Sequence, residues 1–125
     1  MTSGFSEFLE EMFAPLGGVS MRRMFGGIGI WREGLMFALA ADDVLYFKAD
    51  EETVPLFEAE GSAPFTYTAK DGRTTVMSFW RAPERVFDDP DALTEFARHA
   101  SAAARRADAK KAAKAARKSR PVGTD

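Results

Sequence analysis

Residues 24–50 read MFGGIGIWREGLMFALAADDVLYFKAD, and this stretch decides the predicted fold. It contains three short apolar runs, at residues 24–31, 35–41 and 44–49, separated by the polar breaks REG and DD. Short breaks of this kind between apolar runs are typical of antiparallel strands joined by tight turns. We therefore expect a three-stranded meander, covered by helices that precede and follow it in the sequence.

Gly26, Gly27 and Gly29 stand in the first run, where glycine weakens a strand and therefore needs a reason. Close packing of another element, a bend, or backbone offered to a ligand would each provide one. A phosphate-binding loop is disfavoured, because such a loop opens a helix and usually brings a Lys-Ser or Lys-Thr pair. If the run is one strand, Gly27 and Gly29 share a face opposite Ile28 and Ile30.

The second run is apolar on both faces, which predicts a central strand that is covered twice. Strict alternation places Leu35, Phe37, Leu39 and Ala41 on one face and Met36, Ala38 and Ala40 on the other. The second cover is a helix or a partner subunit. A homodimer whose sheets meet through Met36, Ala38 and Tyr46 is one such arrangement.

Helices are predicted on both sides of the meander. An apolar stripe at helical spacing marks the first one: Phe5, Phe8, Leu9, Met12, Phe13 and Leu16. Pro15 and the following Gly-Gly pair end this helix. Asp50 can cap a second, short helix over residues 51–59, whose regular part begins at Val54 because Pro55 is tolerated only in a first turn.

The remainder of the chain predicts a hairpin and a last helix. An Asp-Gly pair between the β-rich runs 65–69 and 74–81 is a strong hairpin signal. Asp89 followed by Pro90 is typical of a helix start. Beyond Ala107 this helix contains only alanine as an apolar residue, so we expect it to leave the domain there and to fray into a solvated tail.

These elements follow the order α-βββ-α-ββ-α. That order predicts an α+β domain over residues 1–104, with one five-stranded, mainly antiparallel sheet covered by helices. A basic tail, helical or disordered, follows over residues 105–125.

Composition excludes several functional classes. The 125 residues include no cysteine and one histidine, so disulfides and thiolate chemistry are excluded and a transition-metal site is disfavoured. No run approaches the roughly 20 apolar residues of a membrane span. The acidic N-terminus lacks the features of a signal peptide. We expect a cytoplasmic protein without a membrane partner.

The sequence places no set of residues for catalysis. His99 lies off the apolar stripe of the last helix, which predicts a solvent-facing residue. No His or Lys is positioned by the sequence to activate a serine or threonine, and the carboxylate clusters fit a turn and a helix start. We therefore expect a non-enzymatic protein with no catalytic residue, no metal site and no cofactor.

Charge divides the chain into an acidic body and a basic tail. Residues 1–104 carry a net charge of −8, whereas residues 105–120 carry +7. The basic side chains of the tail are Arg105, Arg106, Lys110, Lys111, Lys114, Arg117, Lys118 and Arg120. Such a segment contacts nucleic acid phosphates without reading sequence, or serves only as a solubilising extension. It has no aromatic residue, which disfavours base stacking.

A second basic feature surrounds the glycine-rich run. Arg22 and Arg23 precede it, and Lys48 and Arg81 lie at the predicted ends of other strands. If these strand ends converge, the four cations and the adjoining glycines form a partner-binding patch. The alternative is a set of solvated strand-end charges.

Several of these residues resemble one known family, the TfoX (Sxy) N-terminal domain. The resemblance covers about residues 5–104 and rests on RRMFGGIGI at 22–30, LYFKAD at 45–50, Phe57 with Gly61, PF-x-Y at 64–67, and Leu93 with Phe96-Ala97. It implies the same element order and a fold similar to secretion chaperones. It also implies a regulator of competence for DNA uptake that acts as a coactivator, through protein contacts, with a CRP-type transcription activator. The family offers no catalytic or ligand-binding residue to carry over.

A different class of function stays open beside this one. A groove next to the strand at residues 26–29 would suit a small-molecule-binding domain or an unrecognised enzyme.

Overall fold

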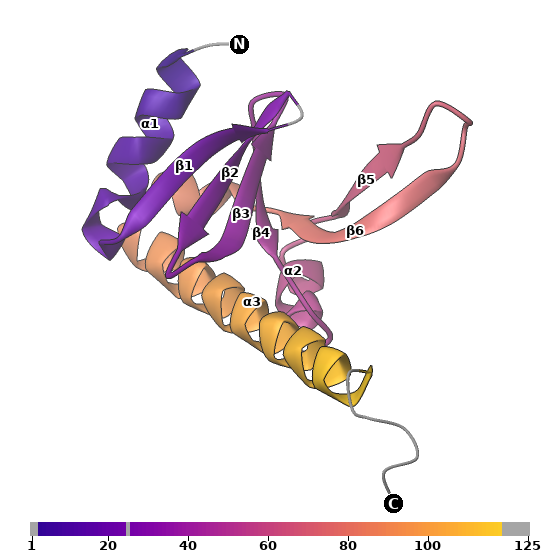
Figure 1. The fold of residues 1–125 in the computed structure, drawn as a ribbon. Coiled ribbons are helices and arrows are strands. Elements are labelled where there is room, and N and C mark those ends of the chain that lie inside the picture. Colours follow the sequence, from indigo (N-terminus) through magenta and orange to yellow (C-terminus); the bar gives the residue numbers. More distant parts are fainter. Residues whose placement is uncertain (1–2, 25, 119–125) are drawn as a thin grey trace, which may run out of the picture.

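A six-stranded antiparallel sheet in the order β1-β2-β3-β4-β6-β5 forms the centre of the fold (Figure 1). The structure is a computed structural model that describes residues 3–24 and 26–118. Within these residues the strands are β1 (Val19–Met24), β2 (Gly27–Arg32), β3 (Leu35–Ala41), β4 (Val44–Lys48), β5 (Pro64–Thr68) and β6 (Thr74–Arg81). The helices are α1 (Ser3–Phe13), η1 (Ala14–Leu16), α2 (Val54–Ala59), η2 (Glu84–Phe87) and α3 (Pro90–Lys118). The α+β class is confirmed.

The predicted count of five strands is wrong, because the first apolar run is not one strand. The chain reverses at Gly26, whose φ of 76° is readily adopted only by glycine. Met24 therefore pairs with Gly27, and β1 and β2 form a hairpin. Phe25 lies outside the described residues. Residues 19–24, which precede the glycines, form the edge strand β1.

The two breaks inside the meander are tight turns, as predicted. Glu33 and Gly34 both have positive φ, at 55° and 79°, and so do Asp42 and Asp43, at 52° and 60°. Two consecutive residues of positive φ are typical of type I′ turns, whose twist matches that of the flanking strands. The hairpin of β5 and β6 also forms where the Asp-Gly pair predicted it, with Gly72 at φ 88°.

A β-bulge in β3 alters which residues face the core. Ile30 pairs with Ala38 but Trp31 pairs with Met36, so Phe37 is an extra residue in β3. Phe37 and Ala38 are consequently both buried, and alternation continues one step out of phase. The strict alternation expected for this strand is therefore wrong after Phe37. Ala38, proposed as a dimer contact, is fully buried in the core.

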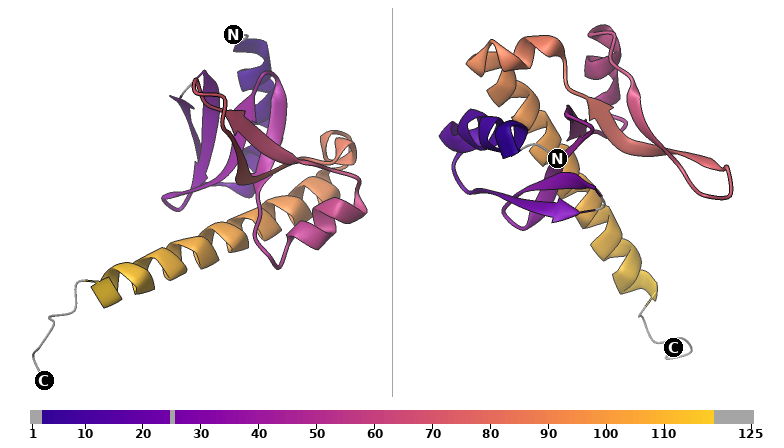
Figure 2. Two further views of the ribbon diagram at one scale, coloured as in Figure 1. Left: turned by 90° about the vertical axis from the view of Figure 1, so that its right-hand side faces the viewer. Right: turned by 90° about the horizontal axis from the view of Figure 1, so that it is seen from above.

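The core lies between one face of the sheet and all three α-helices (Figures 1 and 2). Phe47 of β4 is at its centre, with ring centroids 6.4 Å from Phe13 of α1 and 6.4 Å from Phe96 of α3. Phe57 of α2 joins the same cluster, 5.3 Å from Phe96. Leu9 and Phe13, from the predicted stripe of the first helix, are fully buried.

Helix α3 is longer than predicted. It begins where expected, with Asp89 Oδ1 accepting hydrogen bonds from the backbone N–H of Asp91 and Ala92. Its buried residues end at Ala104, but the helix continues without a break to Lys118. The expected fraying near Ala107 is wrong over these residues, since Ala, Lys and Arg are all strong helix formers. The predicted boundary at 104/105 thus falls inside one helix, whose end projects from the body (Figure 2).

Candidate interaction surfaces

The sheet face opposite the helices is a candidate interaction surface. Strand pairing places Arg22, Gly29, Leu39, Tyr46 and Arg81 in one row across five strands. Neighbouring strands lie about 4.8 Å apart, so the two arginines are separated by roughly 19 Å. No helix among the described residues packs on this face. We call it the open face; besides the row it includes Met24, Trp31, Met36, Lys48 and Phe65.

Side chains pack closely over Gly29 in the middle of the open face. A Cβ added at Gly29 would lie 2.6 Å from Met24 Sδ, 2.9 Å from Trp31 Nε1 and 3.0 Å from Met36 Sδ. At Gly27, an added Cβ would overlap the carbonyl oxygen of Ala40 in the adjacent strand. Close packing within the sheet therefore explains Gly27 and Gly29, and a tight turn explains Gly26; the atoms nearest to an added Cβ at Gly27 or Gly29 all belong to the sheet.

Aromatic rings on the open face are covered by neighbouring side chains. The Arg22 guanidinium lies 5.4 Å from the Trp31 ring centroid, and the Tyr46 and Phe65 centroids are 4.7 Å apart. The Trp31 indole N–H is buried and has no hydrogen-bond partner among the described residues. Trp31 and Tyr46 are both half-buried.

Lys48 is held against β6 at one end of this face. Its Nζ donates a hydrogen bond of 2.7 Å to Ser78 Oγ and lies 5.2 Å from the Phe79 ring centroid. Burial lowers the pKa of the Lys48 ammonium, and the Asp50 carboxylate opposes this shift. These contacts make Lys48 a fixed cation rather than a freely moving one.

The predicted partner-binding residues do not converge into one patch. Arg22 and Arg81 lie at opposite ends of the row, and Lys48 pairs with Phe79, two residues along the strands from the Tyr46–Arg81 pair. Arg23 pairs with Ile28 and so belongs to the other face of the sheet. Three of the four predicted cations, Arg22, Lys48 and Arg81, thus share one face of the sheet, but they do not lie close together.

The second candidate surface is the basic end of α3. Lys110, Lys111, Lys114, Arg117 and Lys118 are all exposed. With 3.6 residues per turn, they fall within an arc of about 120° on the helix circumference. Arg120 lies outside the described residues. Five cations on one side of a projecting helix form a continuous positive strip, which we call the basic strip.

Two residues assigned to the tail belong to the body instead. Arg105 forms an ion pair of 3.8 Å with Glu33. Arg106 donates hydrogen bonds from Nε to Asp50 Oδ2 at 2.7 Å and from Nη2 to Asp50 Oδ1 at 3.1 Å. Arg106 Nε also lies 3.3 Å from a carboxylate oxygen of Glu52. These pairs fix α3 against the body at the point where the helix leaves it.

Asp50 connects three elements through one carboxylate. Besides Arg106, its Oδ1 accepts hydrogen bonds from the backbone N–H of Glu52 and Thr53, just before α2 begins at Val54 as predicted. The hydrogen bond from Arg106 is the main reason that the pKa of Asp50 is lowered from its ordinary value. The sequence suggested Asp50 as a helix cap, but 56 residues separate it from Arg106, and no local signal predicts that pair.

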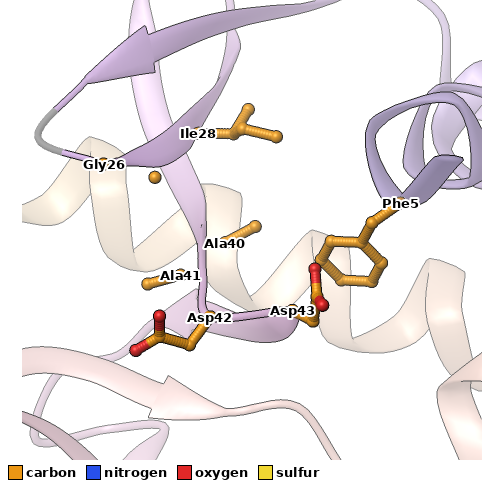
Figure 3. Close-up of a pocket in the computed structure, with 8 residues that line it drawn as sticks. Phe5, Gly26, Ile28, Ala40, Ala41, Asp42 and Asp43 are labelled. Carbon is orange, nitrogen blue, oxygen red and sulfur yellow. The ribbon is translucent and has the colours of Figure 1, made fainter. Parts of the chain in front are cut away.

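A shallow groove lies beside the glycine turn, where the alternative hypothesis expects it (Figure 3). Its volume is about 260 Å³, and it lies between α1 and two turns of the sheet. It is lined by Phe5, Gly26, Gly27, Ile28, Ala40, Ala41, Asp42 and Asp43. Ligand pockets usually have volumes from about 300 to 1,000 Å³. This groove is small, and its charged side chains are two carboxylates.

Metal binding and membrane crossing depend on features that the described residues lack. Within residues 3–24 and 26–118, no three His, Cys, Asp or Glu side chains lie close enough together to hold a metal ion. In the same residues, no helix combines the length and apolar character needed to cross a membrane. His99 is half-buried in α3 rather than fully solvent-facing.

Comparison with known proteins identifies relatives of this fold. Residues 11–104 match the model of a family described as the TfoX N-terminal domain. A curated relative, the DNA transformation protein TfoX1 of Aliivibrio fischeri (strain ATCC 700601 / ES114), is 37% identical over 75 aligned residues, and the alignment covers 57% of this chain. The match covers 36% of that relative, so the chain spans about a third of its length. The family match ends at the last buried residue of α3 and leaves out the basic strip.

Proposed function

We propose a regulatory function in competence for DNA uptake for this chain, which belongs to the TfoX N-terminal domain family. The family match carries the proposal, and the relative named a DNA transformation protein indicates the process. The chain acts in the cytoplasm as a non-enzymatic module. It contributes to transcription as a coactivator, by contacting a CRP-type activator protein.

The open face supports a role in protein contact. A sheet normally buries its apolar face against another layer, and here one apolar face has no cover among the described residues. Leu39, Met36 and Tyr46 provide an apolar centre, while Arg22 and Arg81 provide charge at its ends. An apolar centre with a charged rim is the usual anatomy of a protein interface.

The basic strip supports a second contact, with nucleic acid. Each Lys or Arg that neutralises a phosphate releases counterions, which favours binding without regard to base sequence. Lys110 lies near Asp50, Glu51 and Glu52, but the strip continues to Lys118 on the projecting end of α3, where duplex DNA can approach it (Figure 2). In a transcription complex, this contact adds affinity for DNA near the activator.

Deletion of the gene in the organism that encodes it tests the regulatory role. Natural transformation frequency is expected to fall at least tenfold and to recover when the gene is returned on a plasmid. An unchanged frequency, with competence otherwise inducible in that organism, would contradict the proposal.

A mobility-shift titration with duplex DNA tests the nucleic acid contact. The intact chain is compared with a chain ending at Ala107, which keeps the Arg106–Asp50 pair, and with a variant carrying Gln at the five positions of the basic strip. With five phosphates contacted, the slope of log K against log salt is about −4.5, and it should approach zero in both altered chains. Equal binding of DNA by all three proteins, or no binding by the intact chain at low salt, would contradict DNA contact by the basic strip.

The groove of Figure 3 keeps a small-molecule function as the second candidate. A thermal-shift screen against nucleotides and metabolites tests it. Stabilisation by a compound that is lost in Asp42→Asn but kept in Asp71→Asn, on the distant hairpin, would support binding in the groove. A screen with no stabilising compound would count against it.

A further inference from the structure

We propose that the open face binds a protein segment whose apolar side chains are flanked at both ends by Asp or Glu. This inference deepens the proposed function, since it assigns the chemistry of the protein partner and the surface that receives it. Four properties of the open face lead to it.

The first property is the apolar surface left in the centre of the face. Met24, Met36 and Leu39 surround Gly29, where no side chain rises between them. All three are half-buried, with no helix above them in the described part of the chain. Met side chains adapt readily to different partners, which suits a surface that receives a segment from another protein.

The second property is the charge of the face. The charged side chains that alternate onto it from β1, β4 and β6 are Arg22, Lys48 and Arg81. All three are cations, although residues 1–104 carry a net charge of −8. The strands contain no Asp or Glu, although the Asp50 carboxylate acts on Lys48 at one end of the face, and the face is complementary to an acidic partner.

The third property is the spacing of these cations. Arg22 and Arg81 end the row, and roughly 19 Å separates them across four strand intervals. A helix rises 1.5 Å per residue, so about 13 residues span this distance. A helical segment of three to four turns with a carboxylate near each end therefore reaches both arginines while its apolar side rests on Leu39 and the methionines.

The fourth property disfavours a second copy of this chain. In a face-to-face homodimer both subunits bring the same three cations, and the strands of the face contain no Asp or Glu to pair with them. Like charges would be desolvated against each other, which costs free energy. A heterologous acidic partner avoids that cost.

Single-stranded nucleic acid is disfavoured by the state of the aromatic rings. Proteins that bind single strands stack bases on open aromatic faces. Here the Arg22 guanidinium covers Trp31, and Phe65 lies against Tyr46. The surface that remains for a partner is mainly aliphatic and sulfur-containing.

Amide NMR of the intact, ¹⁵N-labelled chain tests the proposal with a synthetic peptide of about 16 residues. The peptide carries leucines on one helical side and glutamates at both ends; its twin carries lysines in place of the glutamates. We expect the acidic peptide to shift the amide signals of Gly29, Leu39 and Tyr46. We also expect the Arg22→Glu/Arg81→Glu variant to bind the acidic peptide at least tenfold more weakly than the unaltered chain does. The same variant should bind the lysine twin instead. Arg23→Glu/Arg98→Glu makes the same change in net charge away from the open face and should leave the affinity unchanged.

Several outcomes would overturn the proposal. The acidic peptide could fail to bind, could bind no more tightly than its lysine twin, or could shift only the amide signals of the basic strip. A twelve-nucleotide oligothymidylate could also shift the amide signals of the open face more than the acidic peptide does. Dimerisation seen by light scattering and abolished by Leu39→Lys would assign the face to a second copy. A normal transformation frequency after gene deletion would remove the regulatory role and leave this binding intact, so the two failures are distinguishable.

Discussion

Single residues decide how closely the strands of this sheet approach. Gly27 and Gly29 lie two positions apart in β2, yet they have different neighbours. Gly27 faces the backbone carbonyl of Ala40, which cannot move without disturbing the strand pairing. Gly29 faces the sulfur atoms of two methionines and the Trp31 ring, which can change rotamer. The same residue type thus meets a rigid neighbour in one place and mobile ones in the other.

This contrast predicts different costs for adding one methyl group. Gly27→Ala should lower the free energy of unfolding by about 1–3 kcal/mol, because overpacking here shifts backbone. Gly29→Ala should lower the free energy of unfolding by less than Gly27→Ala does, and it should change the fluorescence of Trp31. Urea unfolding of the two variants measures the difference. Equal losses, or a larger loss for Gly29→Ala, would contradict the packing described.

Asp50 is the residue on which β4, α2 and α3 depend together. Asp50→Asn removes a charge that accepts two hydrogen bonds from Arg106, and should cost about 2 kcal/mol, the value typical of hydrogen bonds to charged groups. Asp71→Asn is the matched control, because its pair with Arg73 is largely exposed and should contribute less than about 1 kcal/mol. Chemical denaturation measures the free energy of unfolding of both variants. Similar losses of this free energy in the two variants would contradict the proposed contribution of Asp50.

The lowered pKa of Asp50 also predicts an acid-sensitive contribution to stability. Because the folded pKa lies below the ordinary value of 3.8, the unfolded chain binds a proton first as the pH falls. The contribution is complete above the ordinary value and is lost as the pH falls through the folded pKa. The pKa of Glu60 is lowered in the same direction by Arg85, so some acid sensitivity remains without Asp50. Stability measured from pH 6 to pH 2 should fall more steeply for the unaltered chain than for Asp50→Asn; parallel curves would argue against this linkage.

At the scale of elements, the sequence predicted the turns and helix starts that depend on two or three neighbouring residues. The turns at Gly34, Asp43 and Gly72 were predictable because two or three residues determine them. The start of α3 was predictable from Asp89 and Pro90 for the same reason. The β1–β2 reversal was missed because an uninterrupted apolar run surrounds Gly26, and a turn there looks like a strand in the sequence.

Features that depend on distant residues could not be predicted from the sequence. The bulge at Phe37 arises from the register between β2 and β3, and it exchanges the faces of all the residues after it. The Arg106–Asp50 pair depends on the path of α3 across the body, so a residue assigned to DNA contact is held by a carboxylate instead. The open face could not be predicted either, because it depends on which side of the sheet the helices pack. The likeness to secretion chaperones stays a prediction.

The hairpin of β5 and β6 is the element with the least support. Beyond Phe65 it extends from the sheet, and Tyr67 and Val76 are 57% and 65% exposed (Figure 1). Its backbone hydrogen bonds are therefore open to solvent on both faces, whereas β3 is paired on both edges and covered by α3. Amide hydrogen exchange at residues 66–76 should be at least a hundredfold faster than in β3. Equal protection would show that another surface covers the hairpin.

At the scale of the whole molecule, charge separates two contacts. The acidic body places Arg22, Lys48 and Arg81 on the open face, and α3 carries the basic strip outward on a continuous helix. The two surfaces differ in chemistry: one combines apolar area with three cations, and the other is a helix rich in lysine, arginine and alanine. This arrangement suits a small regulator that joins an acidic protein partner to DNA.

The transformation frequency of strains that carry point variants tests this account most directly. The chromosomal gene is replaced by Arg22→Glu/Arg81→Glu or by the control Arg23→Glu/Arg98→Glu, and protein levels are matched by immunoblot. The account predicts that the open-face variant transforms at least tenfold less often than the unaltered strain, approaching the deletion, while the control transforms normally. Normal transformation by the open-face variant, with the deletion defective, would contradict it.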